Sequence, residues 1–430
     1  MCVSIIVPVH NSEKYLRECI ESALNQSFGE TEILCIDGGS TDASFDIIEE
    51  MRKKDSRVKY LFDKNTSYGH KINVGIKNAA GTYIAILESD DLMSQRMIES
   101  LYHAAQESGA DVVDADFYEL FCYKGKKYRN TIKKYLNPGT YNRLIMRGER
   151  SPEEEFKAIW TALYRKDFLI KNDIQLNESE GASFQDSSFV FLVDLLADAF
   201  YHLDIPLYQY RIDNGGSSVK DDKKIFEIIA EYEFLKNDLM RRGIGNGETW
   251  KSYYKSKYDS FYWNYRRLSQ KAREVFLERY VQELGHDISE DVIDRESFQK
   301  EYKYTFGILD DKERFVRETA EADKRPSMVN LLADLEKVQN RQLVVFGAGI
   351  WGTKAVDIIV QSDCNLCAIC DNSESLQGSM KNGTKIISVE EAAKRFPEAM
   401  YLIASRKYGE EMKAQLLEAK IQEESVIVFA

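Results

Sequence analysis

Four apolar segments alternate with helix-like segments within the first 91 residues, and this alternation restricts the fold more than any other feature. The intervening segments begin with turn residues such as Asn11-Ser12 and carry apolar side chains at helical spacing. A repeated strand–helix order predicts a parallel, right-handed, doubly wound α/β sheet that binds ligands at the carboxyl ends of its strands. The expected strands are Ser4–His10, Glu32–Asp37, Val58–Asp63 and Thr82–Glu88.

The chain is 430 residues long, which exceeds the usual size of one hydrophobic core. After residue 91 the alternation loosens, and residues 219–337 read as almost entirely helical. This pattern breaks near Lys324-Arg325-Pro326, and a new strand is expected from Gln342. We therefore predict three parts: an α/β domain over residues 1–218, a helical region over 219–337, and a small α/β domain over 338–430.

Acidic side chains outnumber basic ones, 71 to 58, and give the chain a formal charge of −13. This surplus argues against nucleic acid, or an anionic membrane contacting the whole surface, as the partner. The sequence contains no apolar run long enough to span a bilayer and no signal peptide at its start. Seven scattered cysteines favour free thiols, so we expect a cytoplasmic protein.

Polar residues cluster at the carboxyl end of each predicted strand of the first domain. Topology alone brings such ends to one cleft, although turns also favour Asn, Asp, Gly and Ser for their backbone geometry. The clusters are Pro8–Asn11, Asp37–Asp42, Asn65–Asn73 and Glu88–Asp91.

The last cluster contains the acid-x-acid sequence Glu88-Ser89-Asp90. Its hard oxygen ligands suit Mg²⁺ or Mn²⁺, and such a site leaves coordination positions for phosphate oxygens. A bound divalent cation would stabilise the charge that develops on a diphosphate leaving group. Surface turns contain the same sequence often, so by itself the motif is a weak signal.

Several segments in sequence resemble the signatures of family-2 glycosyltransferases. They are "VSIIVPVHNSEKYLRECIESALNQSF", "IDGGSTDAS", "NVGIKNAAGTYIAILESDD" and "GASFQDSSF", and the resemblance covers about residues 1–218. It implies the GT-A fold, an α/β sheet that binds a nucleotide sugar, and transfer of the sugar with inversion. The donor sugar and the acceptor are not implied.

The resemblance also implies roles for the first two strand ends. Pro8, Val9 and Asn11 match the strand end that lines the nucleotide pocket. Asp37 matches the first acid of the family's Asp-Asp-Gly-Ser pattern. Gly38 replaces the second acid of this pattern, which contacts the uracil base in some members, so this sequence departs from the pattern at that position. The donor that the resemblance implies is a UDP-sugar.

The remaining donor residues follow from the same resemblance. Glu88 and Asp90 match the acid-x-acid positions around Ser89, with Asp90 as the metal ligand and Mn²⁺ or Mg²⁺ as the cofactor. Glu88 replaces the usual Asp, so it either joins the metal site or contacts the ribose or a metal-bound water. Lys71 and Asn73 match positions that contact the donor's phosphates or sugar.

Asp186 matches the family's general base, which must lie within hydrogen-bond reach of the acceptor hydroxyl. The alternative is that Asp186 caps the following helix, Ser187–Leu196. Arg211 lies in a segment that also resembles the family and is a candidate contact to the diphosphate. An ordinary surface arginine before a Gly-Gly turn is the other interpretation of Arg211.

The helical region carries an aromatic stripe with a basic flank, which fits an anionic membrane surface where a glycan or lipid-linked acceptor is met. Packing of the stripe on neighbouring helices is the alternative. The basic loop Tyr123–Tyr135 is a second candidate for an anionic acceptor or lipid headgroup, or a solvated loop. The stripe comprises Trp250, Tyr254, Tyr258, Phe261, Tyr265, Leu268 and Ala272.

The C-terminal part contains a strand, the turn Gly347-x-Gly349-x-x-Gly352 and a helix, with Asp371 at the end of the next strand. This spacing is typical of a Rossmann-like dinucleotide site. The part is short for a complete dinucleotide fold, so regulation or homodimerisation are alternatives. For the whole chain, the alternatives to a glycosyltransferase are an NAD-dependent sugar-nucleotide-modifying enzyme and a non-catalytic nucleotide-binding scaffold.

Overall fold

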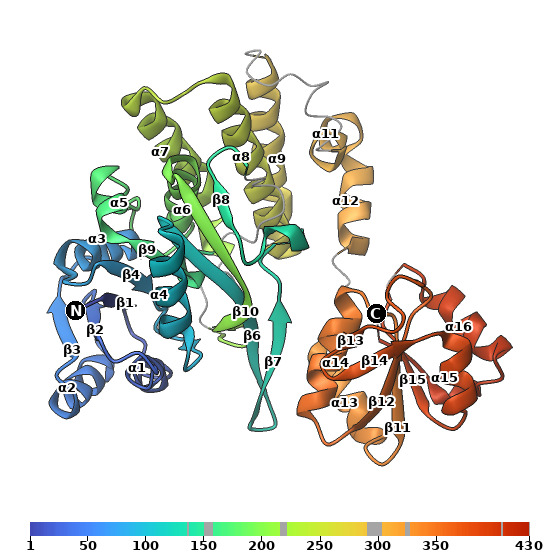
Figure 1. The fold of residues 1–430 in the computed structure, drawn as a ribbon. Coiled ribbons are helices and arrows are strands. Elements are labelled where there is room, and N and C mark those ends of the chain that lie inside the picture. The colour runs from blue at the N-terminus through green and yellow to red at the C-terminus, as the bar shows by residue number, and fades with distance from the viewer. Residues whose placement is uncertain are drawn as a thin grey trace. The chain divides into compact units, whose positions relative to one another are not determined.

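The computed structural model describes residues 1–135, 137–149, 158–215, 222–289, 303–322, 327–405 and 407–429. These residues form two compact units (Figure 1). The first unit comprises Met1–Phe117 and Lys133–Asp323, and the second comprises Tyr118–Ile132 and Lys324–Ala430. Most of the region predicted to be helical therefore belongs to the same unit as the N-terminal α/β domain.

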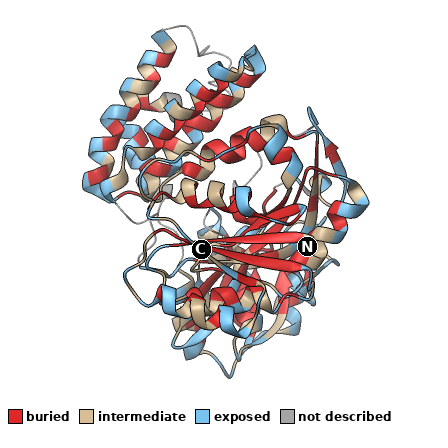
Figure 2. Ribbon diagram, turned by 90° about the vertical axis from the view of Figure 1, so that its left-hand side faces the viewer, coloured by how far each residue is buried: buried red, intermediate tan, exposed pale blue. Residues whose placement is uncertain are grey.

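The N-terminal half of the first unit is a parallel α/β sheet, as predicted. Its strands are ordered β3-β2-β1-β4, and Val9 of β1 pairs with Asp37 of β2, so the two strands end together. β1 and β2 are buried along their whole length, because helices cover both faces of a parallel sheet (Figure 2). The elements are β1 (Val3–Val9), α1 (Leu16–Leu24), β2 (Thr31–Asp37), α2 (Ser44–Lys54), β3 (Val58–Phe62), α3 (Tyr68–Asn78) and β4 (Tyr83–Ile86).

The sheet continues beyond β4 with strands of mixed direction. β9 pairs antiparallel with β4 and with β6, and the order then runs through β10 to β5. These elements carry the second half of the candidate site. They are β5 (Leu92–Met93), α4 (Met97–Ser108), β6 (Val112–Tyr123), β7 (Lys126–Ile132), β8 (Leu144–Met146), β9 (Ala162–Arg165), α5 (Lys166–Lys171), α6 (Gln185–Leu196) and β10 (Ala199–Arg211).

The predicted aromatic stripe packs inside the helical part of this unit rather than facing outward. Tyr254, Tyr258, Phe261 and Tyr265 of α8 are all buried, and Lys257 between them pairs with Asp287 of α9. None of the described helices is long and apolar enough to cross a membrane. The helices are α7 (Glu227–Arg242), α8 (Gly247–Arg267), α9 (Gln270–Ser289), α11 (Lys303–Asp310) and α12 (Lys312–Ala322).

The second unit contains a doubly wound sheet, ordered β13-β14-β12-β11-β15-β16. Its strands pair in parallel except at the β13–β14 edge. The strands are β11 (Gln342–Phe346), β12 (Asn365–Cys370), β13 (Met380–Lys381), β14 (Thr384–Ile387), β15 (Met400–Ile403) and β16 (Val426–Val428). The helices are α13 (Met328–Lys337), α14 (Ile350–Gln361), α15 (Val389–Arg395) and α16 (Gly409–Glu418).

The basic segment Tyr123–Tyr135 is largely a β-hairpin arm rather than a solvated loop. The backbone N–H of Thr131 donates to Asp357 of α14 over 2.6 Å, and Phe121 and Tyr128 join the core of the second unit. Lys124 pairs with Glu336, so part of the basic charge of this segment is neutralised.

Candidate active site

The ends of β1 and β4 and the start of α6 surround one pocket of about 630 Å³. Members of three predicted polar clusters line it: Asn11, Tyr68 and the acidic turn Glu88–Asp91. Asp186 joins them from the start of α6, whereas the fourth cluster, Asp37–Asp42, is not on the lining. Its lining residues are His10, Asn11, Ser12, Lys14, Tyr15, Tyr68, Glu88, Ser89, Asp90, Asp91, Trp160, Ala182, Ser183, Phe184, Gln185, Asp186, Tyr210, Asn214 and Gly215.

Glu88 is a buried carboxyl group of this pocket with a strongly raised pKa. Burial raises its pKa to about 8, and the nearby carboxylates of Asp90 and Asp186 act in the same direction. The hydroxyl of Tyr68 opposes this effect, because it donates a 2.5 Å hydrogen bond to Glu88 Oε1. A carboxyl group in this setting is stabilised as an anion when a cation enters the pocket.

Asp90 and Asp91 have different environments although they are adjacent. Asp91 is buried and accepts hydrogen bonds from the Tyr208 hydroxyl at 2.9 Å and the Arg211 backbone N–H at 2.7 Å. It therefore ties the acidic turn to β10. Asp90 lines the pocket, and its Oδ2 accepts a 2.7 Å hydrogen bond from the Asn214 amide.

Asp186 is the second residue of α6, in the first turn of that helix rather than at its N-cap, which is Phe184. Burial raises its pKa, whereas its own backbone N–H and that of Ser187 lower it, as expected for an acid at a helix N-terminus. Asp186 also lines the pocket, and its charge contributes to the raised pKa of Glu88. A raised pKa suits a carboxylate that accepts a proton near neutral pH.

The ends of β1 and β2 build the neighbouring wall. Asn11 has a φ of 51°, and its side-chain oxygen accepts a 2.8 Å hydrogen bond from the Thr41 N–H. Asp37 is buried and accepts from the Ser40 N–H at 2.9 Å, so it closes the turn after β2. Pro8 and Val9 lie within β1, behind Asn11.

Lys71 lies behind the pocket rather than on its lining. Its ammonium group donates to the Thr66 carbonyl at 2.9 Å, and burial lowers its pKa to about 8. The carboxylates of Glu88 and Asp37 act in the opposite direction. Lys71 thus contributes positive charge behind both acidic strand ends.

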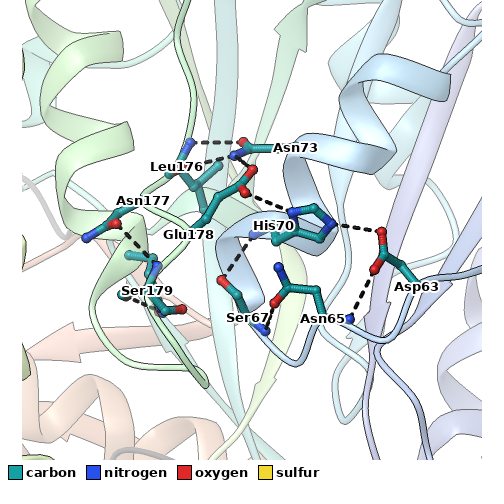
Figure 3. A network of polar contacts seen from close by, with 10 residues as sticks. Asp63, Asn65, Ser67, His70, Asn73, Leu176, Asn177, Glu178 and Ser179 are labelled. Atoms are coloured by element: carbon teal, nitrogen blue, oxygen red, sulfur yellow. Dashed lines mark hydrogen bonds and ion pairs between the residues drawn. The ribbon is translucent and has the colours of Figure 1, made fainter.

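The structure does not bring Asn73 to this pocket. Residues two apart on a helix face different directions, and Asn73 points toward the segment before α6 (Figure 3). Its amide donates to the Leu176 carbonyl at 2.9 Å and to Glu178 at 3.0 Å. His70 lies beside it, 2.9 Å from Asp63 and 2.8 Å from Glu178, and both line a separate pocket of about 940 Å³.

Arg211 is likewise placed beneath the acidic turn and not on the pocket lining. The side chain is buried, its guanidinium pairs with Glu18, and its Nε donates to the Asp90 carbonyl at 2.8 Å. The guanidinium carbon also lies 4.3 Å from the centroid of the Tyr15 ring. These contacts hold the backbone of Asp90 in position, and neither interpretation considered for Arg211, a diphosphate contact or an exposed residue, describes its location.

The C-terminal glycines shape a tight turn before α14. Gly347 has a φ of +105°, and a Cβ at Gly352 would lie 1.8 Å from the Gly347 carbonyl oxygen. Asp371 accepts hydrogen bonds from the Ala348 N–H at 2.6 Å and the Ser373 N–H at 2.8 Å. Gly349 precedes α14 with an ordinary φ of −72°. The Asp371 carboxylate thus already binds backbone groups at this turn.

The pocket's donor set fits a divalent cation whose coordination is completed by a substrate. Glu88 and Asp90 present hard carboxylate oxygens on one lining, and Asp186 adds negative charge nearby. Within the described ranges, no three His, Cys, Asp or Glu side chains are arranged to hold a metal by themselves. Mg²⁺ and Mn²⁺ sites that share a phosphate substrate need only one or two protein carboxylates.

Tyr68, Tyr208 and Asn214 contribute to the site but were not among its predicted residues, and Trp160 was considered as an acceptor contact with core packing as the alternative. Trp160 lines the pocket and stacks on Tyr208, with ring centroids 4.4 Å apart. Tyrosine and tryptophan in apolar segments are usually core residues, so their sequence context gives no signal. Tyr68 falls within the predicted polar cluster Asn65–Asn73, but only the fold brings it to Glu88.

Comparisons with known proteins identify the first unit. Residues 4–172 match the model of Glycosyl transferase family 2. GlyG of Streptococcus pneumoniae serotype 4 is 33% identical over 218 residues, which cover 50% of this chain and 71% of GlyG. EpsH of Bacillus subtilis is 31% identical over 242 residues, which cover 54% of this chain and 67% of EpsH. The chain belongs to glycosyltransferase family 2.

Membership of glycosyltransferase family 2 confirms the predicted GT-A fold, and the β3-β2-β1-β4 sheet is its parallel part. The similarity to GlyA of S. pneumoniae is 29% identity and spans only 31% of that protein. Crystal structures of Staphylococcus aureus TarS 1-349 with UDP align with a TM-score of 0.41 and 23% identity, over 54% of this chain and 65% of TarS 1-349. Residues 339–427 match a separate model, C2185-like, N-terminal.

Proposed function

We propose that the chain is an inverting glycosyltransferase that uses a nucleotide-activated sugar, with a UDP-sugar as the favoured donor. The acceptor would be a glycan or lipid-linked glycan in the synthesis of a bacterial surface polysaccharide. The observation that carries the proposal is the shared pocket of Glu88, Asp90 and Asp186, in a chain of glycosyltransferase family 2.

The proposed chemistry is a single displacement. Asp186 accepts the proton of the acceptor hydroxyl, whose oxygen forms a bond to C1 of the donor sugar. The bond between C1 and the phosphate oxygen breaks at the same time, and the nucleoside diphosphate leaves with the electron pair. Attack opposite the leaving group inverts the configuration at C1, and no covalent intermediate with the protein forms.

The reaction also requires that the negative charge on the leaving diphosphate be stabilised. Mn²⁺ or Mg²⁺ held by Asp90 and Glu88 would supply the positive charge that stabilises it. Tyr68 and Lys71 support Glu88 as an anion, since the hydrogen bond from Tyr68 and the charge of Lys71 both lower the pKa of Glu88. Arg211 and Asp91 hold the acidic turn in place through the contacts described above.

The nucleotide would lie toward Asn11 and Asp37, because the turns after β1 and β2 meet beside the acidic turn. We place the reaction in the cytoplasm, peripheral at the inner face of the cell membrane, where a lipid-linked acceptor would be met. None of the seven cysteines, all of which the structure describes, forms a disulfide, which is compatible with that compartment. The C-terminal unit is proposed to serve regulation or homodimerisation.

Thermal unfolding with UDP, GDP, CDP and NAD, each with and without Mn²⁺, tests the proposal. We expect UDP with Mn²⁺ to raise the melting temperature and Asp90→Ala to abolish this shift. Asp46→Ala, an exposed change on α2, is the matched control and should keep the shift. Absence of a shift with every nucleoside diphosphate and Mn²⁺ contradicts the proposal. A shift with NAD alone favours the alternative of an NAD-dependent sugar-nucleotide-modifying enzyme.

A further inference from the structure

The loop before Asp186 accepts hydrogen bonds from two other parts of the first unit, α3 and the helical part. The Tyr68 N–H of α3 donates to the Gly181 carbonyl at 2.7 Å. From the helical part, Lys224 donates to the Ala182 carbonyl at 3.2 Å, and Glu231 accepts from the Ser188 N–H at 3.3 Å. The helical part therefore contributes directly to the position of the proposed base.

Phe184, two residues before Asp186, adopts a conformation that is strained for a residue with a side chain. Its φ is +65°, in the left-handed region that bulky residues rarely enter. The residue lines the pocket together with Glu88, Asp90 and Asp186. Strain of this kind persists where the surrounding structure enforces it, and it is concentrated at functional sites.

The contacts that hold Phe184 come from α8. The ring of Trp263 lies edge-on to Phe184, with centroids 6.0 Å apart and planes at 87°. The Arg267 guanidinium carbon lies 5.3 Å from the Phe184 centroid and 6.0 Å from the Trp263 centroid. Arg267 is itself oriented by a 2.8 Å hydrogen bond from its Nε to Asn264.

Trp263 differs from the stripe residues of the same helix in its exposure. Tyr254, Tyr258, Phe261 and Tyr265 are at most 2% exposed, whereas Trp263 is 46% exposed. The four stripe rings pack inside the helical part, whereas the Trp263 side chain is partly open to solvent and contacts Phe184, a residue of the pocket lining. A partly exposed aromatic side chain beside a pocket is available to stack on a ligand.

We propose that Phe184, Trp263 and Arg267 form an acceptor platform, on which a pyranose ring of the acceptor stacks beside Asp186. The apolar C–H face of a pyranose complements an aromatic ring, whose face carries partial negative charge. The acceptor is favoured over the donor because Asn11, toward which the nucleotide is proposed to lie, lines the pocket just after β1, whereas Phe184 lines it from the loop that carries Asp186. This inference rests on the proposed function and names the acceptor class of the same site.

Two of the three platform residues, Trp263 and Arg267, belong to the helical part, and α8 lies beyond residues 4–172 that match the family model. Glycosyltransferases that share the donor pocket can thus differ in acceptor through the region that follows it. The structure assigns Trp263 the role of an acceptor-specificity residue, and Arg267 that of a positioning residue acting on the two rings.

Saturation-transfer NMR of the full chain with UDP and Mn²⁺ tests the platform. The probes are the methyl α- and β-glycosides of glucose, galactose, mannose, rhamnose and N-acetylglucosamine. We expect at least one glycoside to bind, with the strongest signals on the C–H protons of one ring face. Trp263→Ala should weaken that binding roughly tenfold or more, and Trp263→Tyr should retain most of it.

Val275→Ala, at another exposed apolar residue of the helical part, is the matched control and should bind the glycoside like the wild type. UDP-induced stabilisation should be equal in all these variants, which separates failure of the platform from failure of the proposed function. The inference is overturned if no glycoside binds the UDP-bound wild type, or if Trp263→Ala binds as tightly as the wild type. It is also overturned if Val275→Ala weakens binding equally.

Discussion

The hydroxyl of Tyr68 lies 2.5 Å from Oε1 of Glu88, and the backbone N–H of the same tyrosine donates to the Gly181 carbonyl at 2.7 Å. One residue at the start of α3 therefore joins the acidic turn after β4 to the loop that carries Asp186. The two carboxyl groups of the proposed reaction are held relative to each other by this link. Its removal should consequently affect chemistry more than stability.

Tyr68→Phe removes a hydrogen bond that lowers the pKa of Glu88, which burial has already raised to about 8. We expect the acidic limb of the pH–rate profile to move to higher pH and the rate at pH 7 to fall about tenfold, or ~1.4 kcal/mol. Release of nucleoside diphosphate measured between pH 6 and 9 checks this. Tyr102→Phe, a change outside the pocket lining, should leave the profile unchanged, and equal profiles for Tyr68→Phe and wild type would refute the assigned role.

His70 should contribute to the free energy of unfolding in a pH-dependent way. Hydrogen bonds to Asp63 and Glu178 raise its pKa above the ordinary 6.5 (Figure 3). The stabilisation is therefore complete below about pH 6.5 and is lost as the pH rises through the raised pKa. His70→Asn should lower the free energy of unfolding by at most about 1 kcal/mol at pH 5.5, because the carboxylates are partly exposed, and by less at pH 9. Chemical denaturation at both pH values measures this, and equal losses at pH 5.5 and 9 would count against it.

The turn before α14 predicts a sharp contrast between two glycines. Gly352→Ala would place a Cβ 1.8 Å from the Gly347 carbonyl oxygen, and the shift needed should cost about 1–3 kcal/mol or more. Gly349→Ala meets nothing within 4 Å and should change stability little. Calorimetry of the full chain should show a lowered transition for Gly352→Ala alone. Equal effects of both substitutions would contradict the geometry of this turn.

Loss of the buried Lys257 charge should strongly lower the stability of the helical part. Its ammonium group lies 2.7 Å from Asp287 and 3.0 Å from Glu283, with the side chain almost fully buried. Lys257→Met leaves both carboxylates without this partner and should cost about 3–5 kcal/mol. Lys251→Met, at an exposed position of α8, should stay within about 0.5 kcal/mol of the wild type. A loss below about 1 kcal/mol for Lys257→Met would show that the pair is dispensable.

The parallel strands were predictable because a buried strand reads as a continuous apolar run. Glu32–Asp37 was expected and β2 spans Thr31–Asp37, while Val58–Asp63 was expected and β3 spans Val58–Phe62. The fourth strand ends at Ile86, earlier than expected, because the chain turns at Glu88, whose carbonyl accepts from the Asp91 N–H at 3.0 Å. Apolarity alone does not mark that change of direction.

The candidate site was predictable where it is local in sequence and unpredictable where it is not. The acidic turn comes at the end of the predicted fourth strand, so its position could be inferred from that strand. The position of Asp186 near a helix start could likewise be inferred from the apolar helix that follows it. The partners Tyr208 and Arg211 come from β10, more than a hundred residues after Asp91, and only the folded sheet brings them together. Helical geometry, by contrast, already separates Lys71 from Asn73.

The proposed glycosyl transfer is tested most directly by measuring UDP release from UDP-sugars with Mn²⁺ present. The proteins compared are the wild type, Asp186→Asn and Asp90→Asn. The measurement follows UDP and the transferred sugar by mass spectrometry for a panel of UDP-sugars. We predict turnover of at least one donor by the wild type, a loss of a hundredfold or more in Asp186→Asn with UDP-induced stabilisation retained, and loss of both properties in Asp90→Asn. Wild-type turnover that persists in Asp186→Asn, or no turnover of any nucleotide sugar, would contradict the central claim.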